Sequence, residues 1–138
     1  MRPVDYTAAI KVSPTEYLRL SEFEHLGRST YCATVDASVT SFACRHYLFC
    51  FADLPGFIRR LDAAFQTLKG TVALQTERET DSLTFHFNGR GGVLLSADFG
   101  RSNCPIGTGS LKFDFTFDQT YLGPFLVELG AISLALHG

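Results

Sequence analysis

The chain has 138 residues, of which 46% are hydrophobic and 19% charged, a balance typical of one globular domain spanning residues 1–138 and not of a disordered chain. Its formal net charge of −2 lacks the basic excess expected of a nucleic-acid-binding protein. The N-terminal residues lack the apolar run of a secretory signal, and no segment approaches about 18 uninterrupted apolar residues, so we expect a soluble, cytoplasmic protein without membrane contact.

The first half of the chain is predicted to form strands. Mildly apolar segments occupy residues 6–12 and 17–23. Glu16, Glu22 and Glu24 interleave with the apolar residues of the second region, as in a half-exposed edge strand. Residues 31–39 alternate between apolar and polar side chains, which predicts a strand with one solvated face. Residues 42–51 have apolar side chains on both faces, so we expect a central strand that is covered on both sides.

The four cysteines form no C-x-x-C pair and have no matching group of histidines, so the sequence predicts no metal site. Cys44 and Cys50 lie in the apolar segment 42–51 and are expected to be reduced core side chains. A disulfide between Cys32 and Cys44 across neighbouring strands stays open as an alternative. For Cys104, no positive group or helix start is placed to lower its pKa.

An amphipathic helix is expected over residues 54–69. Asp53 is a suitable N-cap, Pro55 fits the first turn, and Gly70 follows the last turn. The predicted apolar stripe consists of Leu54, Phe57, Ile58, Leu61, Phe65 and Leu68. Such a helix packs by one face on a sheet.

Four further strands are predicted by alternation over residues 72–74, 83–87, 93–99 and 111–117. The separators are polar or rich in glycine. Residues 88–92 favour a hairpin turn over a phosphate-binding loop, because they precede a strand and lack the Lys-Ser/Thr of a P-loop. The sequence thus indicates no cofactor-binding motif.

A second helix is predicted over residues 120–136, directly after the last strand. Asp118 or Thr120 can cap it, and Pro124 fits its first turn. Its predicted buried residues are Leu122, Phe125, Leu126, Leu129, Ile132 and Leu136. The whole pattern predicts an α+β fold, with an antiparallel sheet of about six to seven strands and both helices packed on one face.

The opposite, polar sheet face is where catalytic residues are sought. Alternation places His86, Asp98 and Asp114 there, and His86 with Asp98 is the only His/Asp combination that the strand periods put on one surface. Any solvated sheet face supplies such residues by default. We therefore interpret them as surface residues and predict no catalytic residue.

Residues 111–125 and 54–61, with Gly70 and residues 92–95, resemble small bacterial proteins of the WapI-type immunity family. The resemblance covers roughly residues 42–136. Its most specific part is the run Asp-Gln-Thr-Tyr-Leu-x-Pro-Phe that begins at Asp118, because strand–helix physics alone would accept many other sequences there. Family members often have a histidine before the valine, where this chain has Gly92.

The resemblance implies a cytoplasmic, non-catalytic antidote that binds and blocks a toxin domain delivered by a competing sibling cell. Blocking a toxin needs surface complementarity but no catalytic group. Two interface hypotheses follow: the acidic turn with Glu77, Glu79 and Asp81, or the polar sheet face around His86, Asp98 and Asp114. Two other classes stay open: a self-associating structural domain such as a homodimer, and a small ligand-binding protein or hydrolase that uses the polar sheet face.

Overall fold

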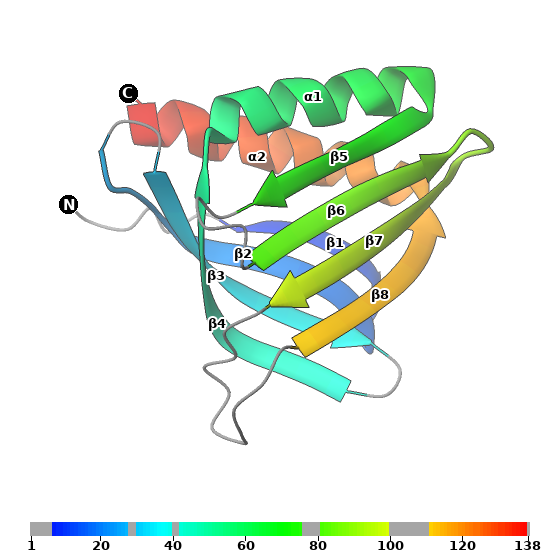
Figure 1. The fold of residues 1–138 in the computed structure, drawn as a ribbon, viewed down its shortest axis with the longest axis horizontal. Helices are drawn as coiled ribbons and strands as arrows, with labels where there is room; N and C mark the ends of the chain where they lie inside the picture. Colours follow the sequence, from blue (N-terminus) through cyan, green and yellow to red (C-terminus); the bar gives the residue numbers. More distant parts are fainter. Residues whose placement is uncertain (1–6, 28–29, 40–41, 76–80, 100–110, 138) are drawn as a thin grey trace.

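The computed structural model describes residues 7–27, 30–39, 42–75, 81–99 and 111–137 (Figure 1). Within these ranges the chain forms two antiparallel four-stranded sheets and two α-helices. The first sheet has the order β1 (Ala8–Ser13), β2 (Glu16–His25), β3 (Thr30–Val39), β4 (Phe42–Ala52). The second has the order β5 (Lys69–Gln75), β6 (Asp81–Asn88), β7 (Gly92–Phe99), β8 (Leu111–Asp118). Helix α1 (Leu54–Thr67) connects the sheets, and a 3-10 turn, η1 (Gln119–Tyr121), leads from β8 into α2 (Leu122–His137).

The two sheets lie one in front of the other, and both helices run along the same side of the pair (Figure 1). Helix α1 packs on β5, α2 packs on β1, and the helices contact each other. The helices therefore cover one edge strand of each sheet, which hides backbone groups that would otherwise invite pairing with another chain. At the edge of the first sheet, the backbone amide of Ala9 donates a 3.1 Å hydrogen bond to a carboxylate oxygen of Glu128 in α2.

One aromatic-rich core fills the space between the sheets and the helices. The ring of Tyr47 in β4 stacks on Phe99 in β7, with centroids 4.3 Å apart. Towards the helices, Phe85 in β6 lies 5.9 Å from Phe57 of α1 and 6.0 Å from Phe125 of α2, centroid to centroid. The alternating Phe positions predicted for the second sheet are therefore the inner face, and burying a residue of this size contributes about 1.5–3 kcal/mol.

The prediction of a single sheet of six to seven strands was wrong. The predicted strands exist, but α1 takes the chain from β4 of one sheet to β5 of another. The shared helix face was predicted correctly only in part: both helices reach Phe85, whereas the first sheet covers the rest of the inner face. Alternation tells which side of a strand is buried, but it does not say whether a helix or a second sheet buries it.

The expected places of β2 and β4 were also wrong. Strand β2 lies inside its sheet, between β1 and β3, and its Glu22 accepts a hydrogen bond from the Thr34 hydroxyl of the neighbouring strand. Strand β4 lies at an edge, and its Leu48 is 54% exposed on the outer face. A β-bulge in β4, opposite residues 35–37, turns Cys44 inward as well as Tyr47. The bulge changes the parity of the strand, so apolar residues of both parities lie on one face.

The predicted cap of α1 was correct, and Asp118, one of the two caps predicted for the second helix, caps the 3-10 turn η1 that precedes α2. The Asp53 side chain accepts a hydrogen bond from the amide of Gly56, and Pro55 lies in the first turn of α1. Asp118 accepts from the amide of Thr120 at 2.9 Å, so Asp118 is the cap before α2. Helix α1 ends at Thr67, slightly before the predicted end, because Leu68 already adopts a left-handed conformation with φ 60°.

Candidate functional site

The polar sheet face is the outer face of the second sheet, made by alternate side chains of β5 to β8. It comprises Thr71, Ser82, Thr84, His86, Ser96, Asp98, Lys112, Asp114 and Thr116. The registers place Asp98 opposite Lys112 and Asp114 opposite Ser96. Asp98 and Lys112 form a 3.8 Å ion pair, with side chains 48% and 70% exposed, and a shallow depression of about 360 Å³ lies beside them. Such an exposed pair contributes little to stability, so this face is a solvated surface.

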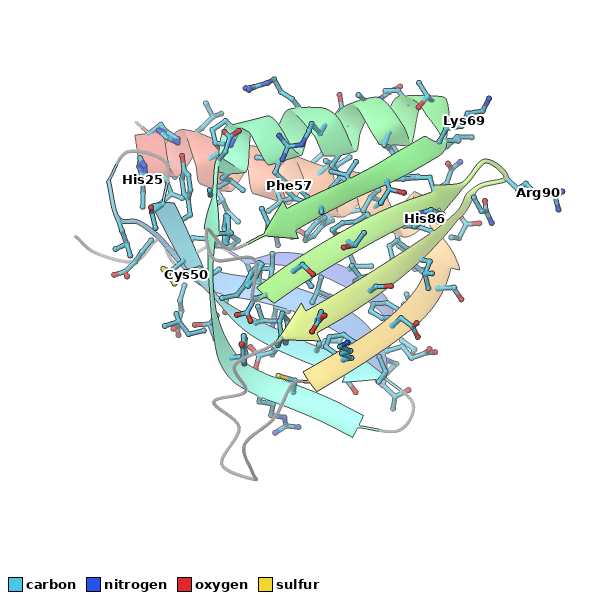
Figure 2. The ribbon with its side chains drawn as sticks, viewed as in Figure 1. His25, Cys50, Phe57, Lys69, His86 and Arg90 are labelled. Atoms are coloured by element: carbon cyan, nitrogen blue, oxygen red, sulfur yellow. A yellow bond between two sulfur atoms is a disulfide. The ribbon has the colours of Figure 1, made fainter. Side chains whose placement is uncertain are left out.

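His86 and Asp98 share this face but do not form a pair. His86 in β6 lies opposite Leu94 in β7, and its Nδ1 is 2.5 Å from the hydroxyl oxygen of Thr71. Asp98 follows Leu94 by four residues, which is roughly 13 Å along the strand. Figure 2 shows His86 on the open front of the sheet. The geometry therefore does not assemble the acid–base pair that a hydrolase using this face would need.

Of the three acidic residues in the predicted turn, only Asp81 lies within the described residues. Its side chain is in the interior, with the residue 7% exposed, and it accepts a 2.8 Å hydrogen bond from the hydroxyl of Tyr47. Asp81 therefore joins the two sheets and presents no carboxylate to a partner. Glu77 and Glu79 lie outside the described residues.

Cys32 and Cys50 form a disulfide, so the expectation that Cys50 is a reduced core cysteine was wrong. The alternative partner, Cys44, is buried and takes no part in this bond. The register of β3 and β4 explains the pairing, because Cys32 lies directly opposite Cys50 on the outer face while the bulge turns Cys44 inward. Figure 2 shows the bond at Cys50. Cys104 lies outside the described residues.

An aromatic cluster at the end of α2, which the sequence did not predict, ties the helix to the first sheet. The Tyr31 hydroxyl lies 2.7 Å from Nε2 of His137, and the His25 ring stacks on Tyr31 at 4.4 Å (Figure 2 labels His25). Burial raises the pKa of Tyr31, and the negative charge of Asp53 raises it further. The tyrosine is thus held in its neutral form. Among the described residues, no group of three or more His, Cys, Asp or Glu side chains could hold a metal ion.

A groove also separates β1 and β2 from the start of α2. Ala9, Lys11 and Arg19 line one side, Tyr121, Pro124 and Glu128 line the other, and its volume is about 540 Å³. A second hollow of about 520 Å³, over the β1–β2 turn, shares Lys11 and Arg19 with it. The two walls are far apart in the chain, so no local pattern could have predicted this groove.

Helix α2 forms part of the core and part of the surface. Leu122, Phe125, Leu129 and Ile132 are buried, as predicted, whereas Val127 and Leu134 are 74% and 77% exposed. By length and composition alone, residues 119–137 could cross a membrane, with 22% of the apolar window buried. The packing of the helix on β1 and α1 makes it an integral element of this fold.

The match to a protein family decides the identity of the chain. A model of the immunity protein WapI-like family matches residues 6–136. The chain belongs to this family. The match includes all eight described strands and nearly all of α2, so it extends the resemblance seen over residues 42–136 through the first sheet. Neither a curated protein nor a solved structure matches the chain significantly.

In this WapI-like protein, the side chain of Asn88 occupies the space beside Gly92. The Asn88 side chain accepts hydrogen bonds from the amides of Arg90 and Gly92, at 2.7 and 3.0 Å, and so shapes the β6–β7 turn. A Cβ at position 92 would lie 2.5 Å from the Asn88 side-chain nitrogen. A histidine at position 92 would require Asn88 to move away.

Proposed function

We propose that this chain is an antidote that neutralises a cognate toxin by direct binding, without catalysis, in the cytoplasm of the cell that makes it. The observation that carries the proposal is the WapI-like immunity family match over residues 6–136, since immunity proteins imply a toxin partner. The separation of His86 from Asp98 along the sheet supports a binding role over a hydrolase.

A rigid surface suits this role. The two sheets and two helices share one core, and helices cover an edge strand of each sheet. A partner that docks on preorganised elements loses little conformational entropy, so more of the contact energy appears as affinity. Charged side chains at an interface select the partner and accelerate association. The sequence alone pointed to His86, Asp98 and Asp114 on the polar sheet face, and the groove between β1 and α2 is a competing surface.

Co-expression with a toxin domain tests the proposal. The chain is produced with the toxin domain encoded immediately upstream, and growth rescue is measured together with co-purification of the pair. An inactive toxin variant separates binding from toxicity, and an unrelated toxin domain serves as the specificity control. Rescue with a stable complex for the cognate pair alone supports an antidote, whereas a folded chain that neither rescues nor binds contradicts it.

A further inference from the structure

Helix α2 has an apolar side that the described part of the chain leaves uncovered. We call this side the α2 stripe: Pro124, Val127, Ala131, Leu134 and Ala135, which are all exposed and lie along one side of the helix at helical spacing. Its two large members, Val127 and Leu134, are among the most exposed large apolar side chains of the described residues. Adjacent exposed apolar side chains of this kind mark interaction sites more often than isolated ones do.

The α2 stripe continues into the groove beside β1. Pro124 belongs to both, and Tyr121, which is 38% exposed, extends the apolar wall towards β1. Glu128 is the only acidic residue in the sequence of α2, and its carboxylate accepts the hydrogen bond from the Ala9 amide. The surface thus combines a flat apolar strip with a hollow large enough to receive one or two side chains.

Three charged residues line the groove: Lys11, Arg19 and the half-buried Glu128, which accepts from the Ala9 amide. Of these, Lys11 is the group that an acidic partner would approach. Arg19 lies 3.7 Å from Asp36 and over the ring of Tyr17, so Asp36 largely neutralises its charge. Lys11 is exposed, and no ion pair within 4.0 Å joins it to an acidic group of the described residues. On the polar sheet face, Asp98 is paired with Lys112 and His86 with Thr71, whereas Asp114 is exposed.

We propose that the cognate toxin docks on the α2 stripe and the adjoining groove, and not on the polar sheet face. This inference rests on the proposed function. A segment of the toxin places apolar side chains on Val127 and Leu134 and directs a carboxylate to Lys11. Apolar anchors surrounded by a polar rim are the usual distribution of binding energy at protein interfaces, because docking releases water from the apolar surface.

Two other occupants fit the surface less well. A helix that lies on lipid has lysines and arginines on its polar side, whereas the sequence of α2 has neither. A second copy of the chain offers Lys11 only Glu128 from the same surface, and one oxygen of that carboxylate already accepts from the Ala9 amide.

Binding of purified, inactive toxin domain to three sets of variants tests the inference, with circular dichroism to verify folding. Val127→Asp with Leu134→Asp places charge on the stripe and should raise the Kd by about 100-fold or more. The milder pair Val127→Ser with Leu134→Gln should also raise the Kd, by a smaller factor. Lys11→Glu should raise the Kd by about tenfold, whereas Lys11→Arg should leave the Kd unchanged.

The matched control is the polar sheet face. His86→Ala, Asp98→Lys and Asp114→Lys should each leave the Kd within about threefold of the wild type. If these variants lose binding while the stripe variants keep it, the toxin uses the sheet face and the inference is wrong. A free dimer in light scattering that becomes monomeric in the stripe variants would overturn the inference in favour of a second copy. Binding of the free chain to lipid vesicles would overturn it in favour of a membrane. Absence of any wild-type binding would instead contradict the proposed function itself.

Discussion

The hydroxyl of Tyr47 donates a 2.8 Å hydrogen bond to the carboxylate of Asp81 in the interior and so connects the first sheet to the second. The ring of the same tyrosine stacks on Phe99, which places the bond beside the aromatic core. A hydrogen bond to a charged, buried acceptor contributes more than one at the surface, because water does not compete for it. The contact therefore helps to fix the relative position of the two sheets.

Replacement of Tyr47 by phenylalanine should lower the free energy of unfolding by about 1–3 kcal/mol, because Asp81 loses a donor while the ring stays in place. Urea unfolding followed by circular dichroism measures the change. Tyr17→Phe is the matched control: Tyr17 is only half-buried, on the outer face of the first sheet, and its replacement should change stability by less than about 0.5 kcal/mol. Equal changes in the unfolding free energy of the two variants would show that the hydrogen bond between the sheets adds no measurable stability.

The disulfide between Cys32 and Cys50 should make stability depend on the redox conditions. The two cysteines are separated by 18 residues in the sequence. Closing a loop of this size lowers the entropy of the unfolded chain and so stabilises the folded state by about 3 kcal/mol. Oxidised protein should therefore unfold at a higher temperature than protein in reductant. Peptide mapping should find Cys32 linked to Cys50.

The variants for this test separate the three described cysteines. Cys32→Ala with Cys50→Ala should lose the response to reductant, whereas Cys44→Ala should keep it, since Cys44 takes no part in the Cys32–Cys50 bond. In a reducing compartment the disulfide would be opened, so the difference also measures how much stability the protein would lose there. A linkage of Cys32 to Cys44 would contradict the described register.

Local chemistry could be predicted from the sequence, but the partners of each surface could not. The caps at Asp53 and Asp118 and the buried side of α2 follow from residue type and spacing, and the structure confirms them. The second sheet was missed because alternation in a Phe-rich strand is the same whether a helix or a sheet covers it. The bulge in β4 was missed because one extra residue leaves no compositional sign, yet it decided which cysteine faces Cys32.

The candidate site shows the same limit. Periodicity correctly placed His86, Asp98 and Asp114 on one face, but the distance between His86 and Asp98 depends on the register of two strands. Asp81 looked like part of an exposed acidic turn, and only the packing of Tyr47 shows that it is buried. The groove depends on a contact between Ala9 and Glu128, 119 residues apart, for which a single sequence contains no signal.

The cap at Asp118 should be visible in the acid unfolding of the protein. The hydrogen bonds from Thr120, chiefly from its backbone amide, lower the pKa of Asp118 below its ordinary value of 3.8. A lowered pKa means that the folded state favours the ionised carboxylate, so this stabilisation is present above the ordinary pKa and is lost as the pH falls through the lower, folded-state value. Asp118→Ala should remove it and lower the melting temperature most near neutral pH.

Asp118→Asn is the control for the cap, because asparagine keeps an oxygen that accepts from the Thr120 amide but does not titrate. Melting temperatures between about pH 2 and pH 6 should fall less steeply for both variants than for the wild type. The asparagine variant should stay more stable than the alanine variant at neutral pH. If both variants keep the steep acid limb, another carboxylate is responsible for it.

Tyr31 should control stability at the opposite end of the pH range. Its pKa is raised by burial and by the charge of Asp53, so the folded state holds the phenolic proton more tightly than the unfolded state does. The stabilisation is fully present below the ordinary pKa of 10.0 and is lost as the pH rises through the higher folded-state value. Tyr31→Phe should lower the free energy of unfolding by about 1 kcal/mol at neutral pH, because the bond to His137 is lost. Above pH 10 the stability of this variant should fall less steeply than that of the wild type. Tyr121→Phe, at an exposed site, should keep the wild-type alkaline limb in urea unfolding, and an unchanged limb in Tyr31→Phe would contradict the assignment.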